Sequence, residues 1–310
     1  MRRNAFIEHV FRYDRKRSGV SKSLLPGRGL ISLRFLPGLK IPLVVNKGQG
    51  NTLKLRMPNL FILAGPNGAG KSTSAPGILV GARRVDEFVN ADVIAKGEGV
   101  SEIEAGRRTL ARLEALAAAK RSMAFETTLA SRMLLPRIQA MQRSGYLFHL
   151  TFFWLPSADM AVERVAKRVA SGGHSIPEEV IRRRYERGLD NFFNAYSLAA
   201  DTWVVMDNTH GVGRPIAWRR IGTGTLVLDN ALWTSLTGRY MKPRVEEPQA
   251  VREAASADAH LQKVFDPEDI VAGINRAVTE ALRRHKARGE SIVIWRDGKI
   301  VTLKPEEIDV

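Results

Sequence analysis

The sequence contains no cysteine among its 310 residues. This absence excludes a disulfide framework, a zinc site built on thiolates and a cysteine nucleophile, and it fits a reducing compartment. The sequence also lacks any run approaching about 18 consecutive apolar residues, so we expect no membrane-spanning helix. The N-terminal segment does not show the order of positive, apolar and small residues that is typical of a secretory signal. We therefore expect a cytoplasmic protein that makes no membrane contact.

Acidic residues are scarce in the first 56 residues. This segment carries 13 Lys or Arg and two acidic residues, a net charge of +11 out of the +16 of the whole chain, which leaves +5 for the rest. Its short apolar pieces, 31–39 and 41–45, keep no sustained period. We expect a poorly ordered basic leader over 1–56. It could be a transit peptide, a nucleic-acid-binding arm or an extension outside the fold, and we expect no nucleic-acid contact elsewhere.

The strongest motif lies at residues 60–73, where an apolar run breaks into a glycine-rich loop. Gly65, Gly70, Lys71 and Ser72 satisfy the phosphate-binding pattern G-x-x-x-x-G-K-[ST]. Glycines let backbone N–H groups approach phosphates, and the following helix directs its positive end at them. Lys71 is predicted to neutralise the β- and γ-phosphates of ATP, and the Ser72 hydroxyl to complete the coordination of Mg²⁺. The predicted nucleotide-binding residues are Gly65, Pro66, Asn67, Gly68, Ala69, Gly70, Lys71, Ser72 and Thr73.

The rest of the pattern predicts an α/β fold with a doubly wound, mostly parallel sheet. Apolar segments that read as strands alternate with stretches of helical period. The near-continuous hydrophobicity of 148–155 is typical of a central parallel strand covered on both faces. The helix after the glycine-rich loop is expected to run from Ser72 until Pro76 and Gly77 disturb it. The predicted strands are 60–64, 84–89, 123–125, 148–155 and 203–206.

Polar side chains follow two of these strands. Asp92 comes just after the strand that ends at residue 89, and Glu126 and Thr128 come just after the strand that ends at residue 125. Ligands gather beyond the carboxyl ends of the strands in open α/β sheets. Asp92 is predicted to orient or deprotonate an acceptor hydroxyl. Glu126 and Thr128 are predicted to bind a polar substrate, and Glu126 could instead belong to the Mg²⁺ site.

A basic hinge lies between two predicted helices, 159–169 and the helix that restarts near Pro177. Its arginines and lysine flank Gly172 and Gly173, an arrangement suited to a mobile lid that closes over phosphates. A solvated helical face is the competing interpretation. The basic residues of the hinge are Arg164, Lys167, Arg168, Arg182, Arg183, Arg184 and Arg187.

Two further polar residues have ordinary explanations. His149 lies inside a strongly apolar strand, and a packed or hydrogen-bonded histidine is the favoured interpretation. Asp207 follows the strand 203–206 and could help to hold Mg²⁺, but a carboxylate at a strand end often only caps the next turn. Neither residue is therefore included in the predicted site.

The C-terminal region, 210–310, is predicted to be an extension partly packed on the core. A short β segment is expected at 221–228 and a polar connection at 245–260. A helix should begin at Asp266-Pro267, with an apolar stripe at steps of four that ends at Leu282. Asp297-Gly298 between two β-rich runs predicts a hairpin with a type I′ turn.

These groups together indicate a small-molecule kinase. The phosphate loop also resembles that of ABC transporter ATPases, but no Leu-Ser-Gly-Gly signature precedes the late acidic strand. A nucleotide-binding regulatory protein that contacts nucleic acid through 1–56 remains an alternative of another class. A kinase for an antibiotic or another metabolite is the alternative among enzymes.

Over residues 57–209 the sequence resembles the zeta toxin family of P-loop kinases, including relatives described as predicted ATPases. The likeness rests on the phosphate loop, on Asn90-Ala91-Asp92, on Phe125-Glu126-Thr127-Thr128, and on the run 164–187 with its Gly172-Gly173-His174 and Ile176-Pro177. It implies a kinase core over 57–209 whose lid covers about 164–187. It also implies ATP-dependent phosphorylation of the sugar 3-hydroxyl of a UDP-N-acetylglucosamine-type substrate, and an antitoxin protein as a partner.

The resemblance also assigns roles by position. Lys71 and Ser72 would hold phosphates and Mg²⁺, Asp92 would be the acceptor base, and Glu126 and Thr128 would lie in the substrate pocket. Arg168 and one of the three adjacent arginines Arg182, Arg183 and Arg184 would be the lid arginines. This sequence departs from the minimal toxin of the family in two segments, the basic leader and the C-terminal hundred residues.

Overall fold

This computed structural model describes three strands within the first 56 residues and most of the chain from residue 57 onward. The described ranges are 20–25, 28–34, 43–46, 57–81, 85–210, 213–221, 223–243 and 267–310. The chain divides into two compact units, Met1–Arg56 and Met57–Val310. The expected polar connection at 245–260, the first residue of the strand expected from Arg84, and Asp266 lie outside the described residues.

The first unit contains a three-stranded antiparallel sheet in the order β1-β2-β3. Its strands are β1 (Val20–Leu25), β2 (Arg28–Arg34) and β3 (Leu43–Asn46). Val20 pairs with Arg34, and Arg34 pairs in turn with Leu43. The sequence does not predict this sheet, because its strands are short and show no sustained alternation of apolar and polar residues.

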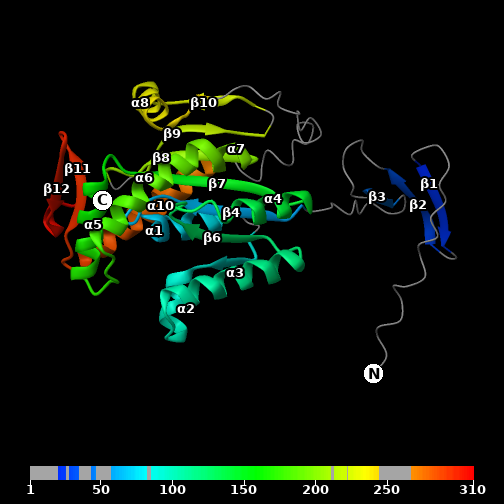
Figure 1. The fold of residues 1–310 in the computed structure, drawn as a ribbon, viewed down its shortest axis with the longest axis horizontal. Helices are drawn as coiled ribbons and strands as arrows, with labels where there is room; N and C mark the ends of the chain where they lie inside the picture. The colour runs from blue at the N-terminus through cyan, green and yellow to red at the C-terminus, as the bar shows by residue number, and fades with distance from the viewer. Residues whose placement is uncertain are drawn as a thin grey trace. The chain divides into compact units, whose positions relative to one another are not determined.

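A seven-stranded sheet in the order β10-β9-β8-β7-β4-β6-β5 forms the centre of the second unit (Figure 1). The strands from β5 to β8 in this order run parallel, whereas β9 and β10 continue the sheet in antiparallel fashion. The bounds are β4 Asn59–Ala64, β5 Glu87–Val89, β6 Met123–Thr127, β7 Leu147–Trp154, β8 Thr202–Asp207, β9 Arg214–Arg219 and β10 Thr225–Val227.

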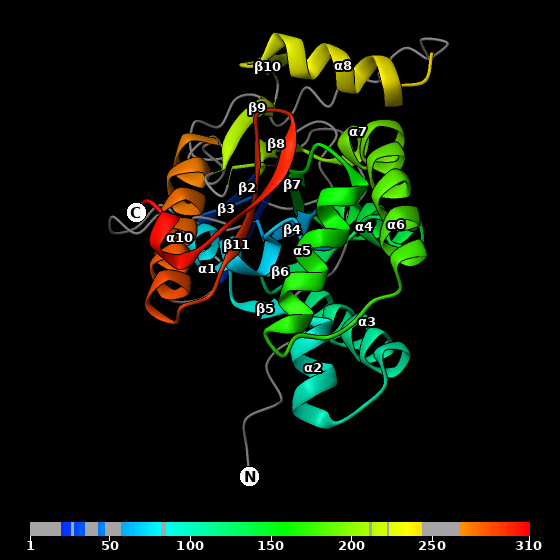
Figure 2. The same ribbon diagram turned by 90° about the vertical axis from the view of Figure 1, so that its left-hand side faces the viewer.

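Helices cover both faces of this sheet (Figure 2). Helices α1 and α10 lie on one face, and α4, α5 and α6 lie on the other. The bounds are α1 Lys71–Gly81, α2 Ala91–Glu98, α3 Glu102–Ala118, α4 Leu135–Arg143, α5 Ala158–Ala170, α6 Glu178–Asn191, α7 Ser197–Ala199, α8 Asn230–Tyr240 and α10 Pro267–Ala287, with the π-helical turn η1 at Phe192–Tyr196. The predicted doubly wound, mostly parallel α/β fold is confirmed.

The strand order places the glycine-rich loop at the topological switch point. Strand β4 pairs in parallel with β6 on one side and with β7 on the other. The chain leaves β4 toward the β5 edge and later returns to the opposite side. A crevice at the carboxyl ends of the strands is expected at such a point, and loop 65–70 begins there.

The central strands are buried, as their hydrophobicity predicts. All residues of β4, β7 and β8 are buried. Within β7, His149 is hydrogen bonded through Nδ1 to Thr202 Oγ1 (2.8 Å) and through Nε2 to Asn59 Oδ1 (3.0 Å). Its ring stacks on Phe61, and burial lowers its pKa to about 3. The interpretation of His149 as a packed, hydrogen-bonded residue is confirmed.

The helix after the glycine-rich loop differs from the expectation. Helix α1 continues through Pro76 to Gly81. Proline in a helix interior removes a hydrogen bond and normally bends or ends the helix. Here α1 packs closely on α10 along Gly77, so tertiary packing outweighs the local preference.

In the C-terminal region the helix and the hairpin agree with their sequence signals, the β segment expected at 221–228 is the shorter β10, and β9 and α8 are not predicted. In α10, Ile270, Ile274 and Val278 are buried on the predicted stripe. Strands β11 (Ile292–Arg296) and β12 (Lys299–Leu303) form a hairpin, followed by a 3₁₀ turn, η3, at Pro305–Glu307. Asp297 and Gly298 both have positive φ, +51° and +75°, as a type I′ turn requires. Among the described residues, no helix is long and apolar enough to cross a membrane.

Candidate active site

The glycine-rich loop has backbone conformations and close contacts that require glycine. Gly65 has a φ of +140° and Gly70 a φ of +82°. A Cβ atom on Gly65 would collide with the carbonyl oxygen of Phe153, and one on Gly70 would collide with the Asn208 amide. The loop therefore lies directly on the ends of β7 and β8 and leaves its other side to a ligand.

Lys71 begins α1 and its side chain turns back over the loop. Its ammonium donates hydrogen bonds to the carbonyl oxygens of Gly65 (2.9 Å) and Pro66 (2.8 Å). Burial lowers the pKa of Lys71 to about 8, even though two nearby carboxylates, Glu126 and Asp92, act in the opposite direction. The ammonium could exchange these carbonyls for phosphate oxygens without leaving the loop.

Glu126 is the penultimate residue of β6, which ends at Thr127 and so runs two residues further than predicted, and it lies beside the start of α1. The Ser72 hydroxyl donates to its Oε2 (2.8 Å) and the Asn90 amide donates to its Oε1 (3.2 Å). Burial raises the pKa of Glu126, and the charge of Asp92 adds to this effect, while Lys71 opposes it. The structure therefore brings Ser72 and Glu126 together, although they are 54 positions apart in the chain.

Asp92 lies in the first turn of α2, after β5. The side chain of Asn90 caps this helix, because its Oδ1 accepts from the N–H groups of Asp92 (2.8 Å) and Val93 (3.3 Å). Asp92 is exposed, and its charge influences the pKa of both Lys71 and Glu126. The side chain of Asn90 thus contacts both residues: its Nδ2 donates to the Glu126 carboxylate, and its Oδ1 accepts from the backbone of Asp92.

Thr128 belongs to a short loop after β6 that helix α6 holds in place. The next residue, Leu129, is buried with a φ of +55°, an uncommon conformation for leucine. Its carbonyl oxygen accepts from Asn191 Nδ2 (2.7 Å), and Gly188 packs so closely on the Thr128 carbonyl that a Cβ there would approach it to 2.5 Å. Strained backbone of this kind is often found at functional sites.

The predicted lid arginines differ in what they contact. Arg168 is exposed and donates to the carbonyl oxygen of His174 (3.1 Å). Arg182 forms ion pairs with Asp159 (2.6 Å) and Glu178 (2.7 Å), and Arg183 is exposed. Arg184 is half-buried, and its charge, together with that of Arg168, helps to lower the pKa of Lys71. Of the three adjacent arginines, Arg184 is therefore the one whose charge acts on the P-loop lysine, whereas Arg182 is engaged elsewhere.

Asp207 is satisfied by its own neighbourhood. Its Oδ1 accepts from the N–H of Thr209 (2.9 Å) and from the Thr209 hydroxyl, and its Oδ2 pairs with Arg214 (3.0 Å). These contacts are those of a turn cap and an ion pair. Asn208, which the sequence does not single out, instead donates to the carbonyl oxygen of Ala69 (2.6 Å) and supports the loop.

The arrangement fits Mg²⁺ together with a bound triphosphate. Ser72 and Glu126 bring a hydroxyl and a carboxylate oxygen together where α1 begins, and both are ligand types that Mg²⁺ prefers. Among the described residues, no group of three or more His, Asp or Glu could hold a metal by itself. This is expected where substrate phosphates and water supply the other ligands.

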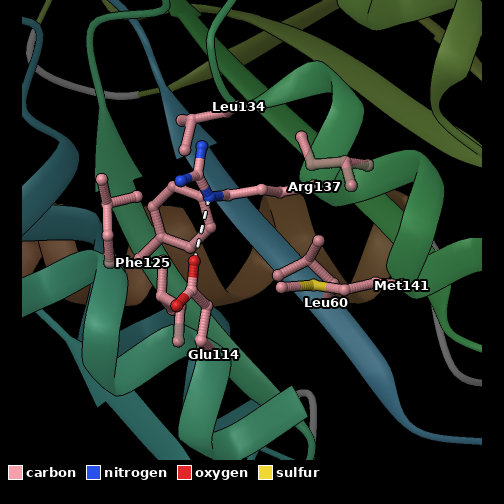
Figure 3. Close-up of a pocket in the computed structure, with 9 residues that line it drawn as sticks. Leu60, Glu114, Phe125, Leu134, Arg137 and Met141 are labelled. Carbon is pink, nitrogen blue, oxygen red and sulfur yellow. Dashed lines mark hydrogen bonds and ion pairs between the residues drawn. The ribbon is translucent and has the colours of Figure 1, made fainter. Parts of the chain in front are cut away.

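A small apolar cavity elsewhere in the core is not part of this site (Figure 3). It lies between α3, α4 and the strands β4 and β6, and its volume is about 10 Å³, room for roughly one water molecule. Its polar groups, Arg137 and Glu114, bond to each other (3.1 Å). The other lining residues are Leu60, Leu110, Leu113, Phe125, Leu134, Ile138 and Met141.

Comparisons with known proteins give a family match for the part of the chain that carries the site. Residues 60–193 match the family model described as an AAA domain. A Haemophilus influenzae (strain Rd) protein, described as uncharacterized, is 25% identical over 127 residues, which cover 39% of this chain and 88% of the relative.

Two solved structures are similar at lower identity. The AvrRxo1-ORF1:-ORF2 structure with ATP is 19% identical, covers 72% of this chain and 76% of that chain, and has a TM-score of 0.45. A structure from the PezAT chromosomal toxin–antitoxin system of Streptococcus pneumoniae is 14% identical, covers 64% and 82%, and has a TM-score of 0.44. Residues 60–193 thus match the AAA domain family model, and this part of the chain has the predicted doubly wound, mostly parallel α/β fold.

Proposed function

We propose that the protein is an ATP-dependent kinase of the zeta toxin type, which transfers the γ-phosphoryl group of ATP to a hydroxyl of a small molecule. One observation carries the proposal. Lys71 and Ser72 of the P-loop lie beside two carboxylates, Glu126 and Asp92, which lie at or just beyond the carboxyl ends of two other strands of the same sheet. A P-loop alone supports phosphate binding, whereas a free carboxylate beside it suits an acceptor that must lose a proton.

The proposed reaction uses Asp92 as the general base. Its carboxylate takes the proton of the acceptor hydroxyl while the hydroxyl oxygen forms a bond to the γ-phosphorus. The bond between the γ-phosphorus and the β–γ bridging oxygen breaks, and ADP leaves. Asp92 then returns the proton to solvent. The exposed position of Asp92 suits contact with a substrate that arrives from outside.

The other groups stabilise charge in this proposal. Lys71 neutralises the β- and γ-phosphates, and Ser72 with Glu126 would hold Mg²⁺, which supplies charge neutralisation when it is bound. Arg168 and Arg184 balance the charge that develops on the transferred group. Both already lie close enough to Lys71 for their charges to lower its pKa.

The acceptor is proposed from the sequence resemblance. A UDP-N-acetylglucosamine-type nucleotide sugar, phosphorylated on its 3-hydroxyl, is the first candidate, and Thr128 would contact it. We assign the kinase core to residues 57–209 with a lid at about 164–187. An antitoxin-like protein partner belongs to the same proposal.

Transfer of labelled phosphate tests this function. The protein is incubated with ATP labelled in the γ-phosphate, Mg²⁺ and a panel of nucleotide sugars, aminoglycosides and simple sugars, and the products are separated by chromatography. We expect a labelled nucleotide sugar with the wild-type protein and none with Lys71→Ala. If another compound carries the label, that compound is the acceptor in place of the nucleotide sugar. Release of inorganic phosphate with no labelled acceptor would contradict the kinase activity.

A further inference from the structure

Arg164 joins three separate segments of the chain around the P-loop. From α5, its Nε donates to the carbonyl oxygen of Val293 in β11 (3.1 Å), and its Nη2 donates to that of Thr209 after β8 (3.1 Å). Its Nη1 donates to the carbonyl oxygen of Gly68 in the P-loop (3.4 Å). The guanidinium is planar and has five donors in a fixed fork, so it can bond several backbone carbonyls at once in one rigid geometry.

The Arg164 guanidinium is also a largely enclosed cation, although the residue as a whole is half-buried. Burial lowers its pKa to about 10, and the charge of Asp207 opposes this shift from a distance. Among the described residues, no carboxylate accepts a hydrogen bond from Arg164, since its three acceptors are backbone carbonyls. A positive charge that is not directly paired therefore stays beside the phosphate loop.

The backbone of the P-loop passes so close to the same residue that there is no room for a side chain at Gly68. Gly68 has a φ of +76°, and a Cβ atom built there would lie 2.9 Å from Arg164 Cβ. Arg164 thus restricts both the carbonyl direction and the path of the loop at Gly68. A loop held in one shape binds its ligand better, because it loses less conformational freedom when the ligand arrives.

The C-terminal segment, 267–310, also contacts α1, the helix that follows the P-loop. Helices α1 and α10 cross at Gly77 and Gly273, where an added Cβ on either glycine would overlap the backbone of the other helix. The backbone N–H of Trp295 in β11 donates to the carbonyl oxygen of Thr209 (3.2 Å). The Lys286 ammonium of α10 donates to the carbonyl oxygen of Ile308 (2.8 Å), which ties the end of the hairpin back to α10.

We propose that residues 267–310 brace the P-loop, and that Arg164 is the positioning residue that connects this brace to Gly68. The brace concerns nucleotide binding and so rests on the proposed function, but not on the identity of the acceptor. It gives the C-terminal region a role in a site to which it contributes no catalytic residue.

Hydrogen exchange of the nucleotide-free protein tests the brace directly. We compare amide exchange in peptides covering residues 65–73 for wild type, Arg164→Lys, Arg164→Gln and Gly273→Ala. Exchange is expected to rise at least three-fold in Arg164→Gln and Gly273→Ala, and less in Arg164→Lys, which keeps the charge. The matched controls are Arg143→Gln, an exposed arginine of α4, and Gly106→Ala, a glycine of α3 with open space around its Cβ position.

ATP binding by calorimetry gives the second measurement. We expect the dissociation constant to rise about ten-fold in Arg164→Gln and Gly273→Ala at a temperature well below unfolding, where a loss of stability alone would leave it unchanged. The brace would be overturned if Arg164→Gln and Gly273→Ala matched the control variants both in amide exchange over 65–73 and in ATP affinity. A wild-type protein that binds no ATP would contradict the proposed function, and the exchange measurement would still decide whether the brace exists.

Discussion

Strands β6 and β8 carry an acidic residue at or next to their carboxyl ends, Glu126 and Asp207, but the two carboxylates have different surroundings. Glu126 accepts from Ser72 and Asn90, which belong to other parts of the site, and burial raises its pKa. Asp207 accepts from Thr209, two residues ahead, and pairs with Arg214. The difference is that the turn after β8 uses the Asp207 carboxylate, whereas the Glu126 carboxylate accepts from residues distant in the chain.

The largest effect is expected at Asp92, which shares the site with Glu126. Asp92→Asn removes the proposed base but keeps the size of the side chain, so kcat should fall about 10²- to 10⁴-fold while ATP affinity changes little. Steady-state kinetics with the labelled acceptor, together with calorimetry for ATP, measures this. A kcat that is unchanged would remove Asp92 as the base.

The arginines of α6 offer a matched pair for the next largest effect. Arg184→Ala should lower kcat about 10²-fold, because its charge acts where the transferred group is expected. Arg182→Ala should change kcat less than about two-fold, since Arg182 forms ion pairs with Asp159 and Glu178 at the surface. Equal effects of the two substitutions would mean that Arg184 belongs only to a solvated helical face.

The comparison of the two strand ends predicts opposite outcomes for two similar substitutions. Glu126→Gln should lower activity roughly 10- to 100-fold with little loss of stability, because it removes a charge from the proposed metal and phosphate region. Asp207→Asn should leave kcat within about two-fold but should destabilise the fold by about 1–2 kcal/mol, because its ion pair with Arg214 is lost. Activity assays and thermal unfolding distinguish the two variants. If Asp207→Asn lost activity and Glu126→Gln lost stability, Asp207 would be the site carboxylate and Glu126 the structural one.

The smallest effect concerns pH. The pKa of Lys71 is lowered to about 8, so in the free protein the ammonium loses its charge as the pH rises past this value. A bound triphosphate favours the charged form, and binding therefore requires proton uptake above pH 8. The dissociation constant of ATP should rise roughly three-fold between about pH 7.5 and pH 8.5. Lys71→Arg keeps its charge in this range and should show no such rise.

Local signals in the sequence predict the elements of the fold well. The apolar run before Gly65 and the Asp297-Gly298 turn each specify their structure through nearby residues. The structure bears out both of them: β4 precedes the loop, and the turn has two positive φ angles. These features depend on backbone sterics and neighbouring hydrogen bonds, which a sequence pattern records.

Contacts between distant segments could not be predicted in this way. The sequence indicates a basic hinge but does not separate Arg164, whose guanidinium donates to three backbone carbonyls, from Arg182, which forms surface ion pairs. Nor does it show that α1 continues through Pro76, because α10 lies almost two hundred residues further along the chain. Their positions depend on packing that no local periodicity describes.

The Gly77–Gly273 crossing also has a consequence for the order in which the protein is made. The ribosome adds about 5–20 residues per second, so roughly 10–40 s separate the synthesis of the two glycines. During this interval α10 has not yet been synthesised and so cannot pack on α1. Protease digestion of nascent chains arrested before and after α10 should find α1 cleaved more readily in the shorter chains. The nucleotide site is therefore completed late in translation, although its defining loop is among the first parts of the domain to be synthesised.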